Sequence, residues 1–395
     1  MTQQTAEREA ARSESSSAPL RNERQRSLGI ALLLESDGPG GAETMMLQLA
    51  EALRDRGHAV CPVGPGNGCG WLADEFRRRG FRPELFVMRR HRFDWRCLLG
   101  LVHTLRRRHV ELVHSHDFMM AVYGAAAAAL LRRPHVITMH GGRYFAGRWS
   151  RRVALRWAMA RAAAAVAVSE GLQTDLAGVL RLPQATFRVI RNGIRPCRGS
   201  PDGVRRELGI EAEEPLIVAI GNLYPVKGHF VLLRALRALV GNPLFARCHV
   251  AIAGRGEEEA TLRAYAEAQD LAPNVHLLGY RADVANLLAA ADVFALPSLS
   301  EGVPLALLEA MFAGKGIAAS AVGGVPEVVT AEREALLVPP DDPQSLAAAL
   351  ARLLEDRTLR RRLGEAARQR AERVFTVDTM VDGYARLYAS AVGSD

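Results

Sequence analysis

Short apolar runs alternate with stretches whose apolar residues recur every three or four positions, and this alternation extends over most of the chain. The runs are "LGIALLLES" (28–36), "HAVCPVG" (58–64), "PELFVM" (83–88), "VELVHSH" (110–116), "HVITMH" (135–140), "AAVAVSE" (164–170), "PLIVAIGNLY" (215–224), "CHVAIAGRG" (248–256), "NVHLLGY" (274–280), "DVFALPS" (292–298), "GIAASAV" (316–322) and "EALLVPP" (334–340). Continuous apolar runs are typical of parallel strands whose two faces are covered by the intervening helices. The sequence therefore predicts an α/β fold.

The alternation pauses at a polar gap near residues 195–214 and then restarts. A chain of 395 residues is also too long for one small core, so we expect two doubly wound, Rossmann-like domains facing across a cleft. Ligands of such sheets bind beyond the carboxyl ends of the strands, which places the site in that cleft. The expected divisions are a disordered leader (1–27), an N-terminal domain (28–195), a C-terminal domain (196–375) and a final helix crossing back to the N-terminal domain (376–395).

Charge is distributed unevenly between the two blocks. Residues 28–195 hold 25 Lys and Arg, all of them Arg, against 13 Asp and Glu, whereas residues 196–395 hold 21 against 26. The segment 148–161 alternates Arg with Trp, Val, Leu and Met, as interfacial helices do. We expect peripheral binding to the inner face of an anionic cell membrane; a solvated arginine surface is the alternative. Few aromatic residues lie among the arginines, so nucleic-acid binding is the least favoured interpretation.

The cysteines indicate the compartment. The chain has five of them, scattered and without a C-x-x-C pair. This pattern fits a reducing cytoplasm and argues against a disulfide or zinc framework.

Glycine-rich turns follow several of the predicted strands. Gly40 and Gly41 precede a helix, and Lys227 with Gly228 opens another. Free backbone N–H groups at a helix start bind anions, and a lysine beside them suits a phosphate. Similar turns occur in "AGRGEEEATL" (253–262) and "AVGGVPEVV" (321–329). A single such turn is as well explained by chain geometry, and a single lysine by solvation. Four of them at matching strand ends favour a phosphate-bearing ligand.

Two predicted strands end in histidine. His114 and His116 share one strand face and could form a metal pair, but no third ligand at suitable spacing is evident. His140 is followed by two glycines at a strand's carboxyl end, where ligands gather. The alternative for each histidine is a purely structural role.

Two glutamates frame the stretch "EGVPLALLE" at residues 301–309. Pro304 suits the first turn of a helix, so Glu301 belongs to the preceding loop and Glu309 to the helix. Eight helical positions rotate by about 80°, so the two carboxylates do not stack. They are suited to accept hydrogen bonds from hydroxyls at two parts of one ligand, such as a sugar and a ribose.

These residues resemble the retaining glycosyltransferases of family 4, which have the GT-B fold. The matching motifs are "GGAE" (40–43), "TMHG" (138–141), "VSEG" (168–171), "VIRNGI" (189–194), "GNLYPVKG" (221–228), "AGRGEEE" (253–259), "EGVPLALLE" (301–309) and "GGVPEVV" (323–329). The resemblance covers about residues 28–375. The pair of glutamates with seven residues between them is its most specific motif.

The resemblance implies roles for individual residues. Glu301 would hold hydroxyls of the transferred sugar, Glu309 the ribose and Lys227 the diphosphate, and His140 would lie beside the donor sugar. Gly40 and Gly41 would supply N–H groups near the diphosphate and acceptor. The implied donor-binding set also includes Asn222, Arg255, Gly302 and Val303, and the implied catalytic set is His140, Lys227 and Glu301.

One position departs from the family pattern. Asn222 stands where many members carry arginine, so one cation on the leaving diphosphate is lost unless another arginine, such as Arg255, compensates. The chain has no D-x-D sequence, which fits a metal-independent enzyme without a cofactor. The implied activity is transfer from a nucleotide sugar, UDP favoured over GDP, to a glycan or lipid-linked acceptor in cell-surface polysaccharide or glycolipid synthesis. The alternatives are a nucleotide-sugar epimerase and a catalytically inactive sugar-nucleotide-binding partner of a glycan-assembly complex.

Overall fold

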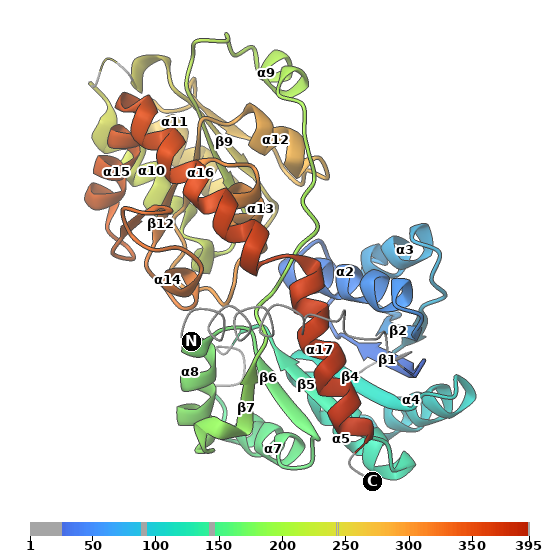
Figure 1. Cartoon of the computed structure of the whole chain (residues 1–395). Coiled ribbons are helices and arrows are strands. Elements are labelled where there is room, and N and C mark those ends of the chain that lie inside the picture. Colours follow the sequence, from blue (N-terminus) through green and yellow to red (C-terminus); the bar gives the residue numbers. More distant parts are fainter. Residues whose placement is uncertain (1–25, 88–92, 142–146, 242, 244, 394–395) are drawn as a thin grey trace, which may run out of the picture.

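The computed structural model describes residues 26–87, 93–141, 147–241, 243 and 245–393, and these form two α/β domains (Figure 1). Each domain is built on one sheet whose strand pairings are all parallel. The prediction of two doubly wound parallel-sheet domains is therefore confirmed. The expected disordered leader lies outside the described residues except for Arg26 and Ser27. Both contact the N-terminal domain, through the Glu111 carboxylate and the Gly57 carbonyl respectively.

The N-terminal sheet has seven strands in the order β3-β2-β1-β4-β5-β6-β7. They are β1 (Gly29–Leu33), β2 (Ala59–Pro65), β3 (Glu84–Phe86), β4 (Leu112–His116), β5 (His135–Met139), β6 (Ala164–Ala167) and β7 (Phe187–Val189). Central strands β4 and β5 are buried along their whole length, as their continuous apolar character requires. Edge strand β7 is the one strand that the apolar runs did not predict.

The C-terminal sheet has six strands in the order β10-β9-β8-β11-β12-β13. They are β8 (Leu216–Ile220), β9 (His249–Ala253), β10 (Val275–Leu277), β11 (Val293–Leu296), β12 (Gly316–Ser320) and β13 (Leu336–Val338). All six lie within predicted runs. In each sheet the strand order reverses beside the first strand, between β1 and β4 and between β8 and β11. Such reversals open the crevice in which ligands of α/β sheets bind.

Helices cover both faces of each sheet. In the N-terminal domain they are α2 (Gly41–Asp55), α3 (Trp71–Arg78), α4 (Trp95–Arg107), α5 (Asp117–Leu131), α7 (Trp149–Met159) and α8 (Glu170–Leu180). In the C-terminal domain they are α9 (Asp202–Leu208), α10 (His229–Leu239), α11 (Glu259–Ala268), α12 (Val284–Ala290), α13 (Leu305–Phe312), α14 (Val325–Val328), α15 (Pro343–Glu355) and α16 (Arg357–Val374). Side-chain N-caps begin several of them: Asp94, Ser169, Asp342 and Asp356 each accept a hydrogen bond from a first-turn N–H group.

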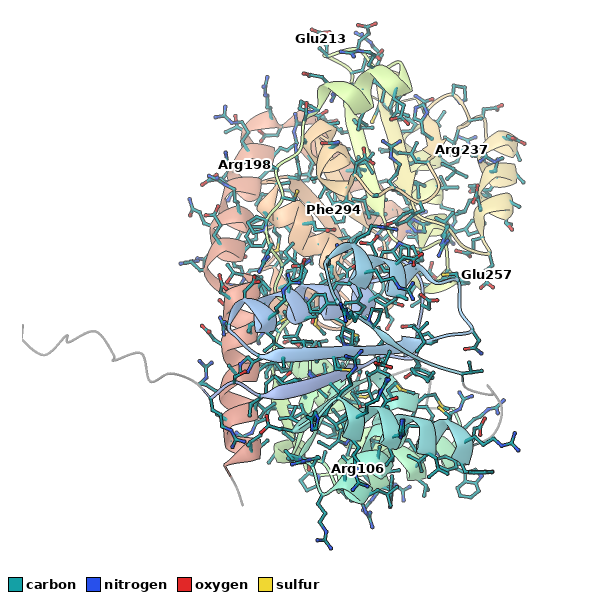
Figure 2. All side chains as sticks on the ribbon, turned by 90° about the vertical axis from the view of Figure 1, so that its right-hand side faces the viewer. Arg106, Arg198, Glu213, Arg237, Glu257 and Phe294 are labelled. Atoms are coloured by element: carbon teal, nitrogen blue, oxygen red, sulfur yellow. The ribbon has the colours of Figure 1, made fainter. Side chains whose placement is uncertain are left out.

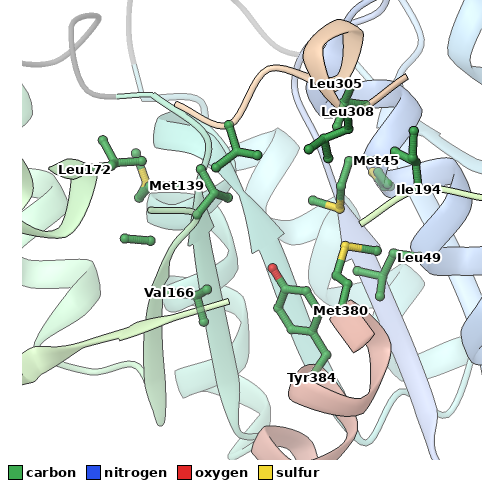
Figure 3. Close-up of a cluster of buried hydrophobic side chains, with 14 of the residues drawn as sticks. Met45, Leu49, Met139, Val166, Leu172, Ile194, Leu305, Leu308, Met380 and Tyr384 are labelled. Carbon is green, nitrogen blue, oxygen red and sulfur yellow. The ribbon is translucent and has the colours of Figure 1, made fainter. Parts of the chain in front are cut away.

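The last helix, α17 (Val377–Val392), runs from the C-terminal domain onto the N-terminal domain, where it packs against α2 (Figure 1). Thr376 caps its first turn, and the Ile194 and Thr376 backbones form a parallel bridge where the chain crosses between domains. Figure 3 shows Met380 and Tyr384 of α17 in one apolar cluster with Leu49 of α2 and Leu305 of α13. One hydrophobic core therefore continues across the domain boundary.

Charged side chains cover the outside of both domains, while Phe294 of β11 lies inside the C-terminal domain (Figure 2). No helix in the described part of the chain has the length and apolar character needed to cross a membrane.

Candidate active site

A cavity of about 660 Å³ lies between the domains, at the carboxyl ends of the strands of both sheets. Nine of the ten site residues predicted from the sequence line it: Gly40, Gly41, His140, Asn222, Lys227, Glu301, Gly302, Val303 and Glu309. The tenth, Arg255, is not among the lining residues. These nine residues are as much as 269 positions apart in the chain, from Gly40 to Glu309.

Lys227 and Glu301 form an ion pair on the cavity wall. The Lys227 Nζ lies 2.7 and 2.9 Å from the two carboxylate oxygens of Glu301, and the Ser298 hydroxyl donates to the same carboxylate at 2.7 Å. The Glu301 side chain is only 7% exposed. A buried carboxylate requires such partners, because burial without them disfavours its charged form.

The backbone beside Lys227 adopts a conformation that only glycine takes easily. Lys227 ends the short 3₁₀ turn η2 (Pro225–Lys227), and Gly228 follows with φ of +66°. A Cβ at Gly228 would lie 2.0 Å from the Pro297 carbonyl oxygen. The glycine therefore lets the loop after β8 pass close to the loop after β11, and this approach brings Lys227 to Glu301.

Glu309 lies inside α13 and faces the same cavity. Burial raises the pKa of its carboxyl to about 7. No Lys, Arg or His in the described part of the chain forms an ion pair with it. A carboxylate left without a protein cation in a cavity is available to accept hydrogen bonds from a ligand.

The N-terminal wall of the cavity is the start of α2. Gly40 is its N-cap in extended conformation, and a Cβ there would lie 2.5 Å from a carboxylate oxygen of Glu43. Glu43 is buried, and burial raises the pKa of its carboxyl. Gly41 faces Leu305 of the other domain. The start of α2 therefore lies beside the domain interface, where its backbone N–H groups could face an anion.

His140 closes the cavity from the end of β5. Its backbone N–H donates to Asp117 Oδ1 at 3.1 Å, and its Nε2 lies 3.1 Å from Nδ1 of His116. Burial lowers the pKa of the His140 imidazole, so the ring is neutral near pH 7. A Cβ on Gly302 would lie 2.5 Å from the His140 carbonyl oxygen, so the two domains touch here through backbone.

Asn222, which departs from the family pattern, and Arg255, the cation that could compensate for it, both lie near the glycine-rich turn that precedes α2. The Asn222 amide is 3.5 Å from the Pro39 carbonyl oxygen. A guanidinium nitrogen of Arg255 lies 3.4 Å from where a Gly38 Cβ would be. Arg255 therefore contacts the turn at the cavity margin and is not among the residues that line the cavity wall.

Three arginines that were not predicted as site residues also line the cavity: Arg78, Arg79 and Arg281. Arg281 pairs with Glu207 and Asp283, and Arg79 pairs with Glu51 and Glu75. The "RRR" run containing Arg78 and Arg79 was visible in the sequence, but nothing in it showed that this run faces the cleft.

Three motifs without an assigned role meet at the domain interface. The Glu327 carboxylate, on α14, accepts hydrogen bonds from the backbone N–H groups of Glu170 and Gly171 at 2.8 and 2.7 Å. Arg191 reaches the same carboxylate at 3.4 Å, and the Asn192 amide donates to the Val303 carbonyl at 3.0 Å. "VSEG", "VIRNGI" and "GGVPEVV" thus hold the two domains together beside the cavity.

The predicted histidine pair of β4 shows no metal-binding arrangement. Both ring nitrogens of His114 lie within hydrogen-bond distance of protein hydroxyls, Tyr388 at 2.6 Å and Thr138 at 2.8 Å. Across the described ranges, no group of three or more His, Cys, Asp or Glu side chains could hold a metal ion.

Both domains of the chain match known glycosyltransferase families. Residues 39–198 match the family described as Glycosyltransferase Family 4, and residues 202–370 match the family described as Glycosyl transferases group 1.

Individual proteins and a solved structure are similar to this chain over most of its length. UDP-Gal:alpha-D-GlcNAc-diphosphoundecaprenol alpha-1,3-galactosyltransferase of Escherichia coli is 28% identical over 311 residues, which span 76% of this chain and 80% of the relative. Alpha-maltose-1-phosphate synthase of Mycolicibacterium smegmatis is 31% identical over 299 residues, spanning 67% and 75%. The crystal structure of Anabaena HepE in complex with UDP-glucose has a TM-score of 0.81 at 25% identity and covers 92% of this chain and 100% of that chain.

Proposed function

The chain belongs to the family of glycosyl transferases group 1 with the GT-B fold, and on this premise we propose that it is a retaining, metal-independent glycosyltransferase. It transfers a sugar from a nucleotide-diphosphate sugar to a glycan or lipid-linked acceptor in the synthesis of cell-surface polysaccharide or glycolipid. The observation that carries this proposal is the joint placement of Lys227, Glu301 and Glu309 on one interdomain cavity.

Each of these groups suits one part of a nucleotide sugar. The Lys227 ammonium and the helix start at Gly40 and Gly41 suit the diphosphate. The Glu301 carboxylate, fixed by Ser298, suits the sugar hydroxyls. The Glu309 carboxyl has no protein cation beside it among the described residues and suits the vicinal hydroxyls of a ribose.

We propose the following reaction for a donor bound in this cavity. The bond between the anomeric carbon and the diphosphate oxygen breaks, and its electron pair leaves with the diphosphate. Lys227 and backbone N–H groups stabilise the developing negative charge without reorganising. The acceptor oxygen then bonds to the anomeric carbon on the face that the diphosphate leaves, and its proton passes to the departing phosphate. Attack on that face retains the anomeric configuration.

Similarity supports a uridine nucleotide. The Escherichia coli relative is named for a UDP-galactose donor, and the Anabaena structure contains UDP-glucose. Both observations concern those proteins, and they favour UDP over GDP here.

Calorimetry with UDP, GDP and ADP, without metal and then with Mg²⁺, tests the proposed donor site. We expect UDP to bind without metal, Glu309→Ala to abolish binding, and Glu355→Ala, at the exposed end of α15, to leave it unchanged. Binding that requires Mg²⁺ would contradict the metal-independent mechanism. Absence of binding by all three nucleotides would contradict the donor site itself. Binding of UDP without any sugar transfer would favour the catalytically inactive partner, for which the neutral Asn222 is the supporting observation.

The outer surface of α7 supports membrane binding. Trp149, Val153 and Trp157 lie four positions apart on one face of this helix, and the first is 71% exposed. Arg152 and Arg156 are exposed beside them. Apolar and aromatic side chains flanked by cations are the pattern of a helix lying at an anionic lipid surface.

Neighbouring helices extend this surface. Helix α5 packs between α4 and α7, and Trp95 and Leu99 of α4 are also exposed. In Figure 2 Arg106 of α4 lies at the end of the molecule opposite Glu213 of the C-terminal domain. We therefore place the membrane against the α4–α5–α7 side of the N-terminal domain.

Liposome flotation tests this placement. We expect binding to vesicles with anionic lipid, weakened by the double substitution Trp149→Ala and Trp157→Ala. Tyr224→Ala, at an exposed aromatic side chain of the C-terminal domain, is the control and should not change flotation. Binding that does not depend on anionic lipid would contradict the proposal.

A further inference from the structure

Three imidazoles lie in one buried layer under the cavity. His114 and His116 come from β4, and His140 follows β5, the neighbouring strand. The His114 and His116 ring centroids are 4.2 Å apart, and Nδ1 of His116 lies 3.1 Å from Nε2 of His140. Only His140 of the three lines the cavity. The other two therefore act on a ligand only through His140.

Burial lowers the pKa values of both His116 and His140 below the ordinary histidine range. Both rings are consequently neutral near pH 7, and each carries one proton. A hydrogen bond between the two facing nitrogens requires one ring to donate and the other to accept. The pair therefore has two possible arrangements, which differ in the atom of His140 that carries its proton.

The far nitrogen of His116 distinguishes the two arrangements. Its Nε2 is buried and has no hydrogen-bond partner among the residues that the structure describes. If His140 donated from Nε2, the proton of His116 would occupy this isolated Nε2 as an unpaired buried N–H. If His116 donates from Nδ1, only a lone pair is left there. Unpaired buried N–H groups are the rarer case in proteins, so the second arrangement is favoured.

We infer that His116 is a positioning residue that donates from Nδ1 to Nε2 of His140 and thereby holds His140 in the tautomer protonated on Nδ1. This inference rests on the proposed function, in which His140 lies beside the donor sugar. In this tautomer His140 offers the sugar a neutral N–H donor at Nδ1. Its Nε2 is occupied as an acceptor, so His140 does not take a proton from the acceptor hydroxyl.

The C-terminal helix fixes the layer from below. The Tyr388 hydroxyl lies 2.6 Å from Nδ1 of His114, and the Tyr384 hydroxyl lies 3.0 Å from the Thr138 hydroxyl, which in turn meets Nε2 of His114. His114 is thus held at both ring nitrogens, and its ring limits the tilt of His116. Two tyrosines near the end of the chain thereby support a histidine pair at the cleft.

The tautomer can be measured directly on the full chain labelled with ¹⁵N-histidine. Long-range ¹H–¹⁵N correlation distinguishes a ring protonated on Nδ1 from one protonated on Nε2, and the signal lost in His140→Gln identifies His140. We expect Nδ1 protonation in the wild-type protein. Protonation of His140 on Nε2 would overturn the inference, whatever the activity of any variant.

Kinetics test the consequence of this hydrogen bond. The amide nitrogen of His116→Asn can occupy the position of Nδ1 and donate, whereas His116→Leu cannot. We expect the leucine variant to lose about tenfold in kcat with little change in the donor KM, and the asparagine variant to recover most of that loss. His135→Asn is the control, since His135 is equally buried but contacts Ser115. Equal losses in the asparagine and leucine variants would contradict the positioning role.

The proposed reaction and the proposed tautomer of His140 can be disproved separately. Unchanged transfer in His140→Ala would remove His140 from the proposed reaction and leave the measured tautomer as a structural fact. A wild-type tautomer protonated on Nε2 would remove the role of His116 while the donor site, tested by nucleotide calorimetry, stands.

Discussion

The Lys227 ammonium contacts both carboxylate oxygens of Glu301, at 2.7 and 2.9 Å, across the gap between the loops that follow β8 and β11. In the unliganded protein each group is therefore the counter-charge of the other. Under the proposed function, a nucleotide sugar offers its diphosphate to the lysine and its hydroxyls to the glutamate. The ion pair consequently competes with the ligand for both groups.

Neutralising Glu301 should separate binding from transfer. In Glu301→Gln the Lys227 ammonium loses its protein counter-charge, so we expect UDP to bind several-fold more tightly. Transfer should fall by about 100-fold, the order of a lost hydrogen bond to a charged group. Calorimetry and a transfer assay measure the two effects.

Lys227→Ala should weaken UDP binding. Arg234→Ala, which breaks an exposed ion pair with Asp341 outside the cavity, serves as the control. If Glu301→Gln and Lys227→Ala weakened UDP binding equally, the competition between ion pair and ligand would be disproved.

Glu309 should make stability depend on pH. Its pKa is about 7 in the folded protein against an ordinary value of 4.5, so the folded state binds more protons between these values. The free energy of unfolding should therefore decrease as pH rises from 4.5 to 7, by about 3 kcal/mol at most from this group. Burial also raises the pKa of Glu35, to about 8, so the wild-type curve contains both contributions.

The difference between wild type and Glu309→Gln isolates Glu309. Urea unfolding at pH 5, 6, 7 and 8 should show a shallower pH dependence in the variant and a higher stability than wild type at pH 8. Parallel curves for the two proteins would mean that the Glu309 carboxyl titrates in its ordinary range.

Two glycines with the same backbone conformation should respond differently to alanine. Gly228 and Gly209 have φ of +66° and +67°, but a Cβ at Gly228 meets the Pro297 carbonyl oxygen at 2.0 Å, whereas a Cβ at Gly209 meets nothing within 4 Å. Gly209→Ala should cost about 1 kcal/mol of backbone strain. Gly228→Ala should cost more and should also displace Lys227, lowering both the melting temperature and the UDP affinity. Similar losses at the two positions would rule out the close approach of the two loops.

Removal of the Glu327 carboxylate should loosen the contact between domains. Glu327→Ala leaves the N–H groups of Glu170 and Gly171 without their acceptors from the other domain. We expect a larger radius of gyration in small-angle X-ray scattering of the nucleotide-free protein. Glu332→Ala breaks an ion pair with Arg352 within the C-terminal domain and should leave the radius unchanged. An unchanged radius in Glu327→Ala would show that other contacts suffice to hold the domains.

Much of the fold follows from the periodicity of the sequence, because buried parallel strands are apolar on both faces. Strand β7 escaped prediction because the exposed Arg188 interrupts its apolar residues at the edge of the sheet. The candidate site was predicted from residue types at strand ends and from the resemblance to the glycosyltransferases of family 4. The ion pair between Lys227 and Glu301 was not predicted, because it depends on β8 and β11 being neighbours, and strand order is not written in local periodicity. The position of Arg78 and Arg79 at the cavity was not predicted either, because it depends on how the two domains pack together.

The crossing of α17 has a consequence for the order in which the two domains complete their folding during synthesis. The strands of the N-terminal domain are complete by residue 189, but the helix that packs against α2 and carries Tyr384 and Tyr388 begins only at Val377. At a synthesis rate of about 5–20 residues per second, roughly 10–40 s separate the two on the ribosome. During that interval the second domain can fold while the first keeps an apolar surface open. The domain translated first is therefore the one that is finished last.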